Sequence, residues 1–230
     1  MNQIITTGVI LNRIDYGEAD RILTVLTPDQ GKLRLIAKGV RRSKSKLAGG
    51  IELFSLSQIT FIRGRSEIGT LISARMGHHY GNIVKNIERT MLGYELIKLL
   101  NKNTEDAPEA EYFELLRRAY EALNNCEIAI EIINLWFLMQ LLGLAGHAPN
   151  LHSDVRRQKL VADKNYNFSF DDMAFLPAEN GQFSAKQIKF LRLGFSHHKP
   201  KILSQIQSSA ELAESLNPLI ETIKNNYLRL

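Results

Sequence analysis

Seven lysines and arginines follow one another between Asp29 and Glu52 without an intervening acid. They are Lys32, Arg34, Lys38, Arg41, Arg42, Lys44 and Lys46. Such a group of cations attracts a polyanion, with nucleic acid the commonest, an acidic protein tail next and a membrane surface third. A solvated loop that only keeps a protein soluble can carry a similar run. Seven cations on a β-rich segment favour a polyanion site.

The excess of positive over negative charge is confined to the first third of the chain. Residues 1–80 hold 12 Lys and Arg against 6 Asp and Glu, whereas the remaining 150 residues hold 17 and 18. The net charge of +5 over 230 residues therefore comes from the segment that contains the basic run. This asymmetry predicts that the N-terminal segment meets the anion.

Residues that could carry catalysis are not grouped in this sequence. It has neither of the glycine-rich phosphate-binding motifs, and its densest acidic cluster, Asp15, Glu18 and Asp20, is more typical of a solvated turn than of a cation site. The histidines are the adjacent pairs His78-His79 and His197-His198, and His147 and His152. We predict no catalytic residue, no metal and no cofactor.

Cysteine usage and hydropathy suggest a compartment. Cys126 is the single cysteine, so no internal disulfide can form, and we expect it to be a buried apolar residue in a reducing, cytoplasmic protein. No secretory signal is visible in residues 1–11. The most apolar stretch, residues 128–142, is shorter than the ~18–20 residues of a membrane span and predicts a buried helix around Trp136.

Short β-branched runs predict about five strands before Tyr80, closed as a small barrel or packed as a sandwich. The runs are 4–5, 9–11, 22–26, 33–36, 59–62 and 70–72. Turn residues separate them, including a hairpin at 27–31 and turns at 63–65 and 67–69.

After Tyr80 the apolar period becomes helical. Helices are expected over about 83–100, 112–123 and 128–142, and again from an N-cap at Ser184 and from Ser209 to Tyr227. Asn217-Pro218 suggests that the last segment is two helices. Residues 144–182 interrupt the helices and suggest loops with a two-stranded ribbon.

Several of these segments resemble the RecO family of recombination mediators. The similar residues are Gly17-Glu18-Ala19-Asp20-Arg21, Gly31-Lys32, the stretch from Ala37 to Gly49, Phe54-Ser55-Leu56, Arg63-Gly64-Arg65 and Gly69-Thr70-Leu71. The match is specific over residues 1–80 and looser beyond. Leu141 to Leu144 and Ala148 to Leu151 resemble the approach to the family's zinc-binding insertion.

The resemblance implies an α+β protein with two domains. Residues 1–80 would form a five-stranded OB-fold barrel that binds DNA. Residues 81–230 would form an all-helical domain with a degenerate zinc-finger-like insertion at 144–182. Many members carry two Cys-x-x-Cys pairs in this insertion, but alignment places Asp154, Arg157, Pro177 and Asn180 at those positions. Such residues cannot reproduce a thiolate site.

The family's activity completes the expectation. RecO proteins bind single- and double-stranded DNA, anneal complementary strands, and work with RecR and the single-strand binding protein SSB to load recombinase. The seven basic residues would contact phosphates, with Arg63 and Arg65 as weaker candidates. The SSB tail needs an apolar surface with a cation, for which Phe190, Arg192, Phe195 and Lys199 are candidates. Core packing of the two phenylalanines is the favoured alternative.

Two other functions stay open. A metal-dependent enzyme acting on nucleic acid would need clustered carboxylates, which only Asp15, Glu18 and Asp20 approach. An adaptor could instead use the basic run to hold an acidic protein tail. The basic run also has no aromatic residue, and Tyr16, Phe54 and Phe61 suit turn or core positions as well as base stacking.

Overall fold

The computed structural model describes residues 2–64, 67–196 and 199–230. The chain packs as two compact units, Met1–Asn125 and Cys126–Leu230. The first unit contains the strands of the N-terminal third and two helices, so the packing boundary lies well beyond the change from strand to helix near Tyr80. The predicted domain division at residue 80 stays a prediction.

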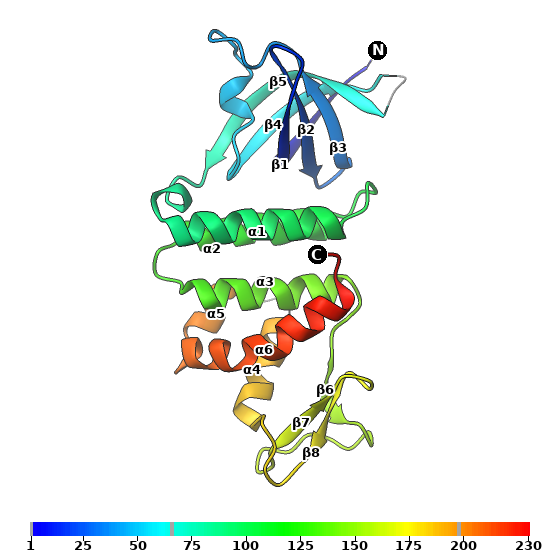
Figure 1. The fold of residues 1–230 in the computed structure, drawn as a ribbon, viewed down its shortest axis with the longest axis vertical. Helices are drawn as coiled ribbons and strands as arrows, with labels where there is room; N and C mark the ends of the chain where they lie inside the picture. Colours follow the sequence, from blue (N-terminus) through cyan, green and yellow to red (C-terminus); the bar gives the residue numbers. More distant parts are fainter. Residues whose placement is uncertain (1, 65–66, 197–198) are drawn as a thin grey trace. The chain divides into compact units, whose positions relative to one another are not determined.

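Five strands form a closed barrel in the order β1-β2-β3-β5-β4 (Figure 1). They are β1 (Gln3–Tyr16), β2 (Asp20–Thr27), β3 (Gly31–Ala37), β4 (Ser55–Ile62) and β5 (Ile68–His79). All neighbours are antiparallel except β3 and β5, and β1 closes the barrel by pairing with both β2 and β4. The barrel confirms the predicted number of strands.

Details of the strands differ from the sequence prediction. The runs at 4–5 and 9–11 belong to one strand, β1, whose first half pairs with β4 and whose second half pairs with β2, with a bulge between Ile10 and Asn12. The predicted turn at 67–69 is wrong, since β5 begins at Ile68 and pairs with Arg34 there. The hairpin at 27–31 is confirmed by the pairing of Thr27 with Gly31.

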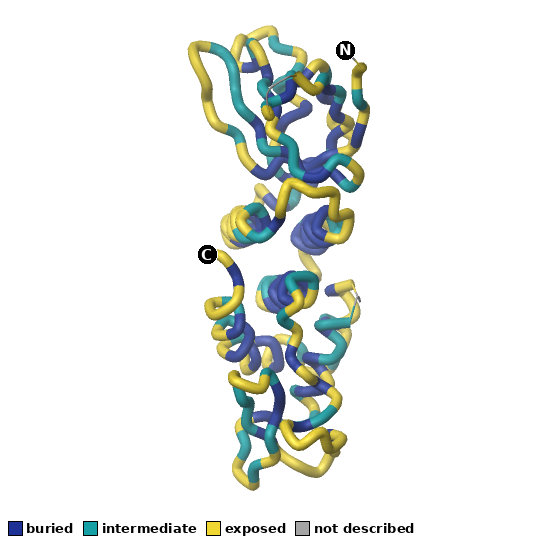
Figure 2. The backbone as a smooth tube through the Cα atoms, turned by 90° about the vertical axis from the view of Figure 1, so that its right-hand side faces the viewer, coloured by how far each residue is buried: buried dark blue, intermediate teal, exposed yellow. Residues whose placement is uncertain are grey.

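Side chains alternate along the strands between the barrel interior and the outer surface, and Figure 2 shows this repeated change of burial. The interior is filled by aliphatic and aromatic residues, including Ile10, Val25, Leu35, Ile59 and Phe61. Outer positions of the same strands are exposed or half-buried. The inner face therefore forms the barrel core, and the outer face holds the positions that meet solvent.

Two helices complete the first unit: α1 (Ile87–Asn103), which follows the short 3-10 helix η2 (Ile83–Lys85), and α2 (Ala110–Asn124). Phe54 joins them to the barrel. It is buried, has a left-handed backbone with φ of 55°, and makes edge contacts with the rings of Tyr94 and Tyr120. A Cβ on Gly93 would lie 2.6 Å from the Phe54 ring, so α1 can approach only through a glycine.

The second unit is built around α3 (Ile130–Leu144). Trp136, Phe137 and Met139 have no exposed surface, which confirms the predicted core helix. Helices α4 (Ala185–Phe195), α5 (Pro200–Ser204) and α6 (Ser209–Tyr227) accompany it. Ser184 caps α4 as predicted, in a capping box with Gln187.

The insertion is a three-stranded sheet of β6 (Asn150–Asp154), β8 (Ala174–Pro177) and β7 (Tyr166–Ser169), in that order, and not a two-stranded ribbon. The third strand is β6, which joins by a short parallel pairing to β8 that leaves no hairpin signal in the sequence. Phe175 packs between the rings of Phe168 and Phe183.

The zinc-finger-like description of this insertion is not supported. Asp154 is buried and its carboxylate accepts hydrogen bonds from the backbone N–H groups of Arg156 at 2.9 Å and Gln158 at 2.8 Å. Arg157, a cation, lies in the same turn with φ of 63°. Among the described residues no group of three or more His, Cys, Asp or Glu could hold a metal. The turn is held by a carboxylate, and the residues present do not fit zinc.

Two further expectations are wrong. Residues 209–227 form one helix with Pro218 inside it. Pro218 has no N–H to donate to the Glu214 carbonyl, but both residues lie on the exposed side of the helix, where water can bind that carbonyl. Cys126 is exposed, because it precedes the apolar helix and lies in the connection before α3. In the described parts of the chain, no helix is long and apolar enough to cross a membrane.

Candidate nucleic-acid interface

The basic loop, residues 38–47, begins at a hydrogen-bonded junction with the β1–β2 hairpin. The Asp20 carboxylate accepts a hydrogen bond from the Gly39 N–H at 2.7 Å, and the Ala19 carbonyl accepts one from the Arg41 N–H at 2.9 Å. Gly39 has φ of 64°, which favours glycine, and Val40 is buried in the barrel core. The family-like segments around Gly17 and around Lys38 therefore meet in space.

The other end of the basic loop is also anchored. The loop runs into the 3-10 helix η1 (Ala48–Gly50), and a Cβ on Gly50 would lie 2.2 Å from the Ala74 carbonyl oxygen of β5. Backbone hydrogen bonds from Arg42 to Gly39 and from Ser45 to Arg42 fold the chain between the two anchors. The loop is thus a defined structure with an exposed tip.

Most predicted phosphate contacts are gathered on this tip. Lys38, Arg41, Arg42, Lys44 and Lys46 are all exposed. Except for Arg41, their side chains make no hydrogen bond or ion pair within the residues that the structure describes. Four cations without an internal partner on one loop give the charge density that an anionic chain requires.

Arg41 is shared between the loop and an acid. Its Nε lies 3.5 Å from one carboxylate oxygen of Asp15. The other carboxylate oxygen of Asp15 accepts a hydrogen bond from Arg21 at 2.8 Å. The hydrogen bond from Arg21 lowers the pKa of Asp15, and the charge of Arg41 lowers this pKa further. Asp15 is therefore ionised at neutral pH and competes with any external anion for Arg41.

Lys32 has an internal role. Its ammonium group donates to the carbonyl oxygens of Thr104 at 2.6 Å and Asn101 at 3.1 Å, at the C-terminal end of α1. Asp106 lies 3.9 Å away, and the Lys32 side chain is 16% exposed. A cation here donates hydrogen bonds to free carbonyl groups at the end of the helix and interacts favourably with the negative end of the helix dipole. The structure separates Lys32 from the exposed cations.

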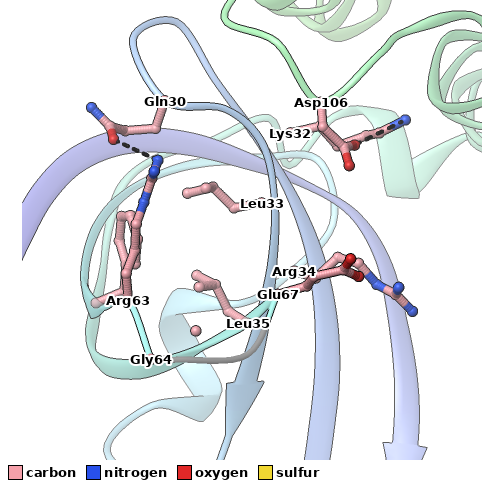
Figure 3. Close-up of a pocket in the computed structure, with 11 residues that line it drawn as sticks. Gln30, Lys32, Leu33, Arg34, Leu35, Arg63, Gly64, Glu67 and Asp106 are labelled. Atoms are coloured by element: carbon pink, nitrogen blue, oxygen red, sulfur yellow. Dashed lines mark hydrogen bonds and ion pairs between the residues drawn. The ribbon is translucent and has the colours of Figure 1, made fainter.

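Arg34 lies on the outer face of β3, exposed, and extends away from Leu33 and Leu35 (Figure 3). The hollow beside these leucines has a volume of about 420 Å³ and also receives Arg63, which donates to the Gln30 side chain at 3.0 Å. Arg65, the other weak candidate, lies outside the described residues, as do His197 and His198. Of the predicted contacts outside the loop, Arg34 and Arg63 are described and could extend a phosphate path.

The acidic cluster considered for a metal is already engaged. Asp15 binds two arginines and Asp20 binds the Gly39 N–H, while Glu18 is exposed. Two of the three carboxylates thus position the basic loop and the hairpin. A divalent cation would have to displace these contacts.

The candidates for a partner surface are not presented together. Phe190 is buried, which agrees with the favoured core alternative, and Phe195 is half-buried. The Arg192 Nε donates to the Leu151 carbonyl at 2.6 Å, which ties α4 to β6. Lys199 is exposed. As a binding surface these residues stay a prediction.

Sequence reasoning missed an apolar row on the outside of the barrel. Ile14 lies opposite Ile22, Ile22 opposite Ile36, and Ile36 opposite Thr70. We name these four residues the isoleucine row. Alternation places each on the outer face, but only the strand register shows that they are neighbours.

Comparison with known families agrees with the arrangement of the chain. The model described as Recombination protein O N terminal matches residues 1–80, and that described as Recombination protein O C terminal matches residues 84–229. The chain belongs to the RecO family. The expected resemblance is therefore confirmed over both halves.

Individual relatives carry the name DNA repair protein RecO. One from Dehalococcoides mccartyi is 34% identical over 163 residues, 70% of this chain and 64% of the relative. One from Desulfatibacillum aliphaticivorans is 34% identical over 154 residues, 66% of this chain and 60% of the relative. Both matches thus cover less than two thirds of the relative's length. One from Acetivibrio thermocellus is 29% identical over 247 residues, 100% of this chain and 96% of the relative.

Proposed function

We propose that this RecO family protein binds DNA through the barrel and the basic loop, anneals complementary single strands, and acts without catalytic chemistry as a recombination mediator. The observation that carries the proposal is the set of exposed cations on the basic loop, four of which have no partner within the described part of the chain. The relatives named DNA repair protein RecO support the same process.

The barrel supports this role as an OB-fold. Its five strands have the number and closure typical of that fold, whose outer face and loops bind oligonucleotides. Arg34 stands on this face, and the basic loop leaves the end of the same strand, β3. A strand of nucleic acid passing over β3 would meet both.

Annealing follows from charge neutralisation. Cations lower the repulsion between two phosphate backbones, so pairing proceeds without a reacting side chain. Binding should be tolerant of sequence and sensitive to salt, since phosphate contacts carry no sequence information. With about four phosphates neutralised on a single strand, the slope of log K against log salt is roughly −3.

The mediator role adds partners. RecR and the C-terminal tail of SSB are the proposed partners for recombinase loading on SSB-coated DNA in the cytoplasm. Lys199 is exposed and Phe195 is half-buried, so in this proposal the first would supply the cation and the second an apolar group for the tail. Phe190 and Arg192 would support this surface from the interior, since one is buried and the other holds Leu151.

The test is annealing of two complementary oligonucleotides, bare and coated with SSB. The variant replaces Lys38, Arg41, Arg42 and Lys44 by Ala. A matched control replaces Lys159, Lys164, Lys186 and Lys189, four exposed lysines of the second unit, and removes the same net charge. We expect the loop variant to lose most annealing and at least half of the salt slope while circular dichroism stays unchanged. The control should anneal normally.

Other outcomes reject the proposal in distinguishable ways. Loss in the control alone would place the DNA site on the second unit. If DNA binding and annealing are unchanged in the loop variant but an SSB tail peptide binds the basic loop, the protein is an adaptor for an acidic tail. Cleavage of DNA that requires Mg²⁺ would show an enzyme.

A further inference from the structure

The outer face of the barrel presents apolar surface where the proposed DNA path crosses it. Ile14 is 54% exposed and pairs with Ile22 of β2 near the tip of the β1–β2 hairpin. Its cross-strand neighbour Ile22, and Ile36 opposite Ile22, are half-buried, so their outer surfaces also meet solvent. Directly opposed side chains have Cβ atoms roughly 5 Å apart, which makes the row continuous from β1 to β3.

Cations border the isoleucine row along β3. Arg34 precedes Ile36 by two residues on the same outer face, and Lys38 follows Ile36 by two residues at the start of the basic loop. In the next outer row, Asn12, Thr24 and Arg34 are polar and lie in register, and the row ends at Ile68 of β5. Of the acids near this face, Asp15 and Asp20 are held by Arg21, Arg41 and Gly39.

The isoleucine row and the cations beside it suit different parts of a nucleotide: the row suits the base and the cations suit the phosphate. Apolar side chains gain contact energy from the flat faces of bases, and every base has such a face. In a duplex those faces are stacked on one another and unavailable, whereas a single strand can turn them toward the protein. The phosphates of that strand would at the same time reach the flanking cations.

We propose that the isoleucine row is the base-contacting platform of this protein and makes it prefer single-stranded over double-stranded DNA. The inference rests on the proposed function and assigns a contact surface to the bases of the DNA, whereas the cations account only for its phosphates. The row takes the place of the aromatic stacking residues that the basic loop lacks. Because isoleucine offers no hydrogen bond to a base edge, the preference is for unpaired bases in general and not for a sequence.

The experiment compares Ile14→Thr/Ile36→Thr with the wild type. Threonine keeps the β-branched shape that suits a strand and removes apolar surface. Ile5→Thr is the matched control, because Ile5 is 62% exposed on the outer face of the same strand but pairs with Thr60 of β4. Ligands are a thymine oligonucleotide, an abasic strand of the same length, and a duplex.

We expect the double variant to bind the thymine strand about fivefold more weakly at every salt concentration, with an unchanged salt slope. Binding to the abasic strand and to the duplex should stay the same. Equal losses on thymine and abasic strands, or no loss on thymine, would overturn the platform. A wild type that binds none of the three ligands would instead reject the proposed function.

Discussion

The Asp20 carboxylate and the Gly39 N–H, nineteen positions apart in sequence, are joined by a hydrogen bond of 2.7 Å that fixes the basic loop to the β1–β2 hairpin. Asp20 therefore has a structural role, positioning the basic loop, that its negative charge alone would not suggest. An acid beside the proposed phosphate path should weaken binding, yet Asp20 positions the cations that we propose as the DNA contacts.

Asp20→Ala should therefore lower DNA affinity, by about threefold, although it removes a negative charge. Glu18→Ala is the matched control, because Glu18 is an exposed acid of the same hairpin, and it should raise affinity slightly. Fluorescence anisotropy with a labelled oligonucleotide measures both. Equal increases in the two variants would show that Asp20 acts only through its charge.

Asp15→Asn should raise DNA affinity by about threefold at low salt, because it releases Arg41 for phosphate. The pKa of Asp15 is lowered by Arg21, so its ion pairs are present above the ordinary carboxyl pKa and are lost only as pH falls through the lowered value. The ratio of variant to wild-type affinity should stay constant between about pH 5 and pH 8. An affinity that falls in Asp15→Asn would contradict the competition.

Lys32→Met and Arg34→Met should have opposite consequences, although the two residues are neighbours on β3. Loss of the Lys32 ammonium leaves carbonyl oxygens of Asn101 and Thr104 without their donor and should lower the free energy of unfolding by about 1–3 kcal/mol. Its DNA affinity and salt slope should not change. Arg34→Met should keep stability and reduce the slope by about 0.7.

Chemical denaturation and salt titrations of the two variants check this pair. A reduced salt slope in Lys32→Met with normal stability would show that Lys32 contacts phosphate after all.

Asp154→Ala should loosen the insertion, because the backbone N–H groups of Arg156 and Gln158 lose their charged acceptor, at a cost of about 1–3 kcal/mol. Asp154→Asn keeps an acceptor oxygen and should have a smaller effect. Hydrogen exchange of the amides in residues 150–183 measures the change locally. A chelator should leave this exchange unchanged in the wild type, and faster exchange on chelation would show that a metal holds the insertion.

The sequence by itself determined much of the local structure. Periodicity predicted five strands and the core helix at Trp136, because alternation and the 3.6-residue repeat are local properties of the chain. The hairpin at 27–31 and the cap at Ser184 followed from turn and cap residues for the same reason. The basic loop was also visible, because charge is a matter of composition.

Tertiary structure decided what those residues contact. Lys32 has the same charge as Lys38, and only the packing of β3 against the end of α1, about 70 residues later, directs its ammonium group inward. Ile14, Ile22 and Ile36 are ordinary strand residues until the register of three strands aligns them on one face. Such long-range pairings depend on how distant segments close upon one another, which the composition of each segment does not specify.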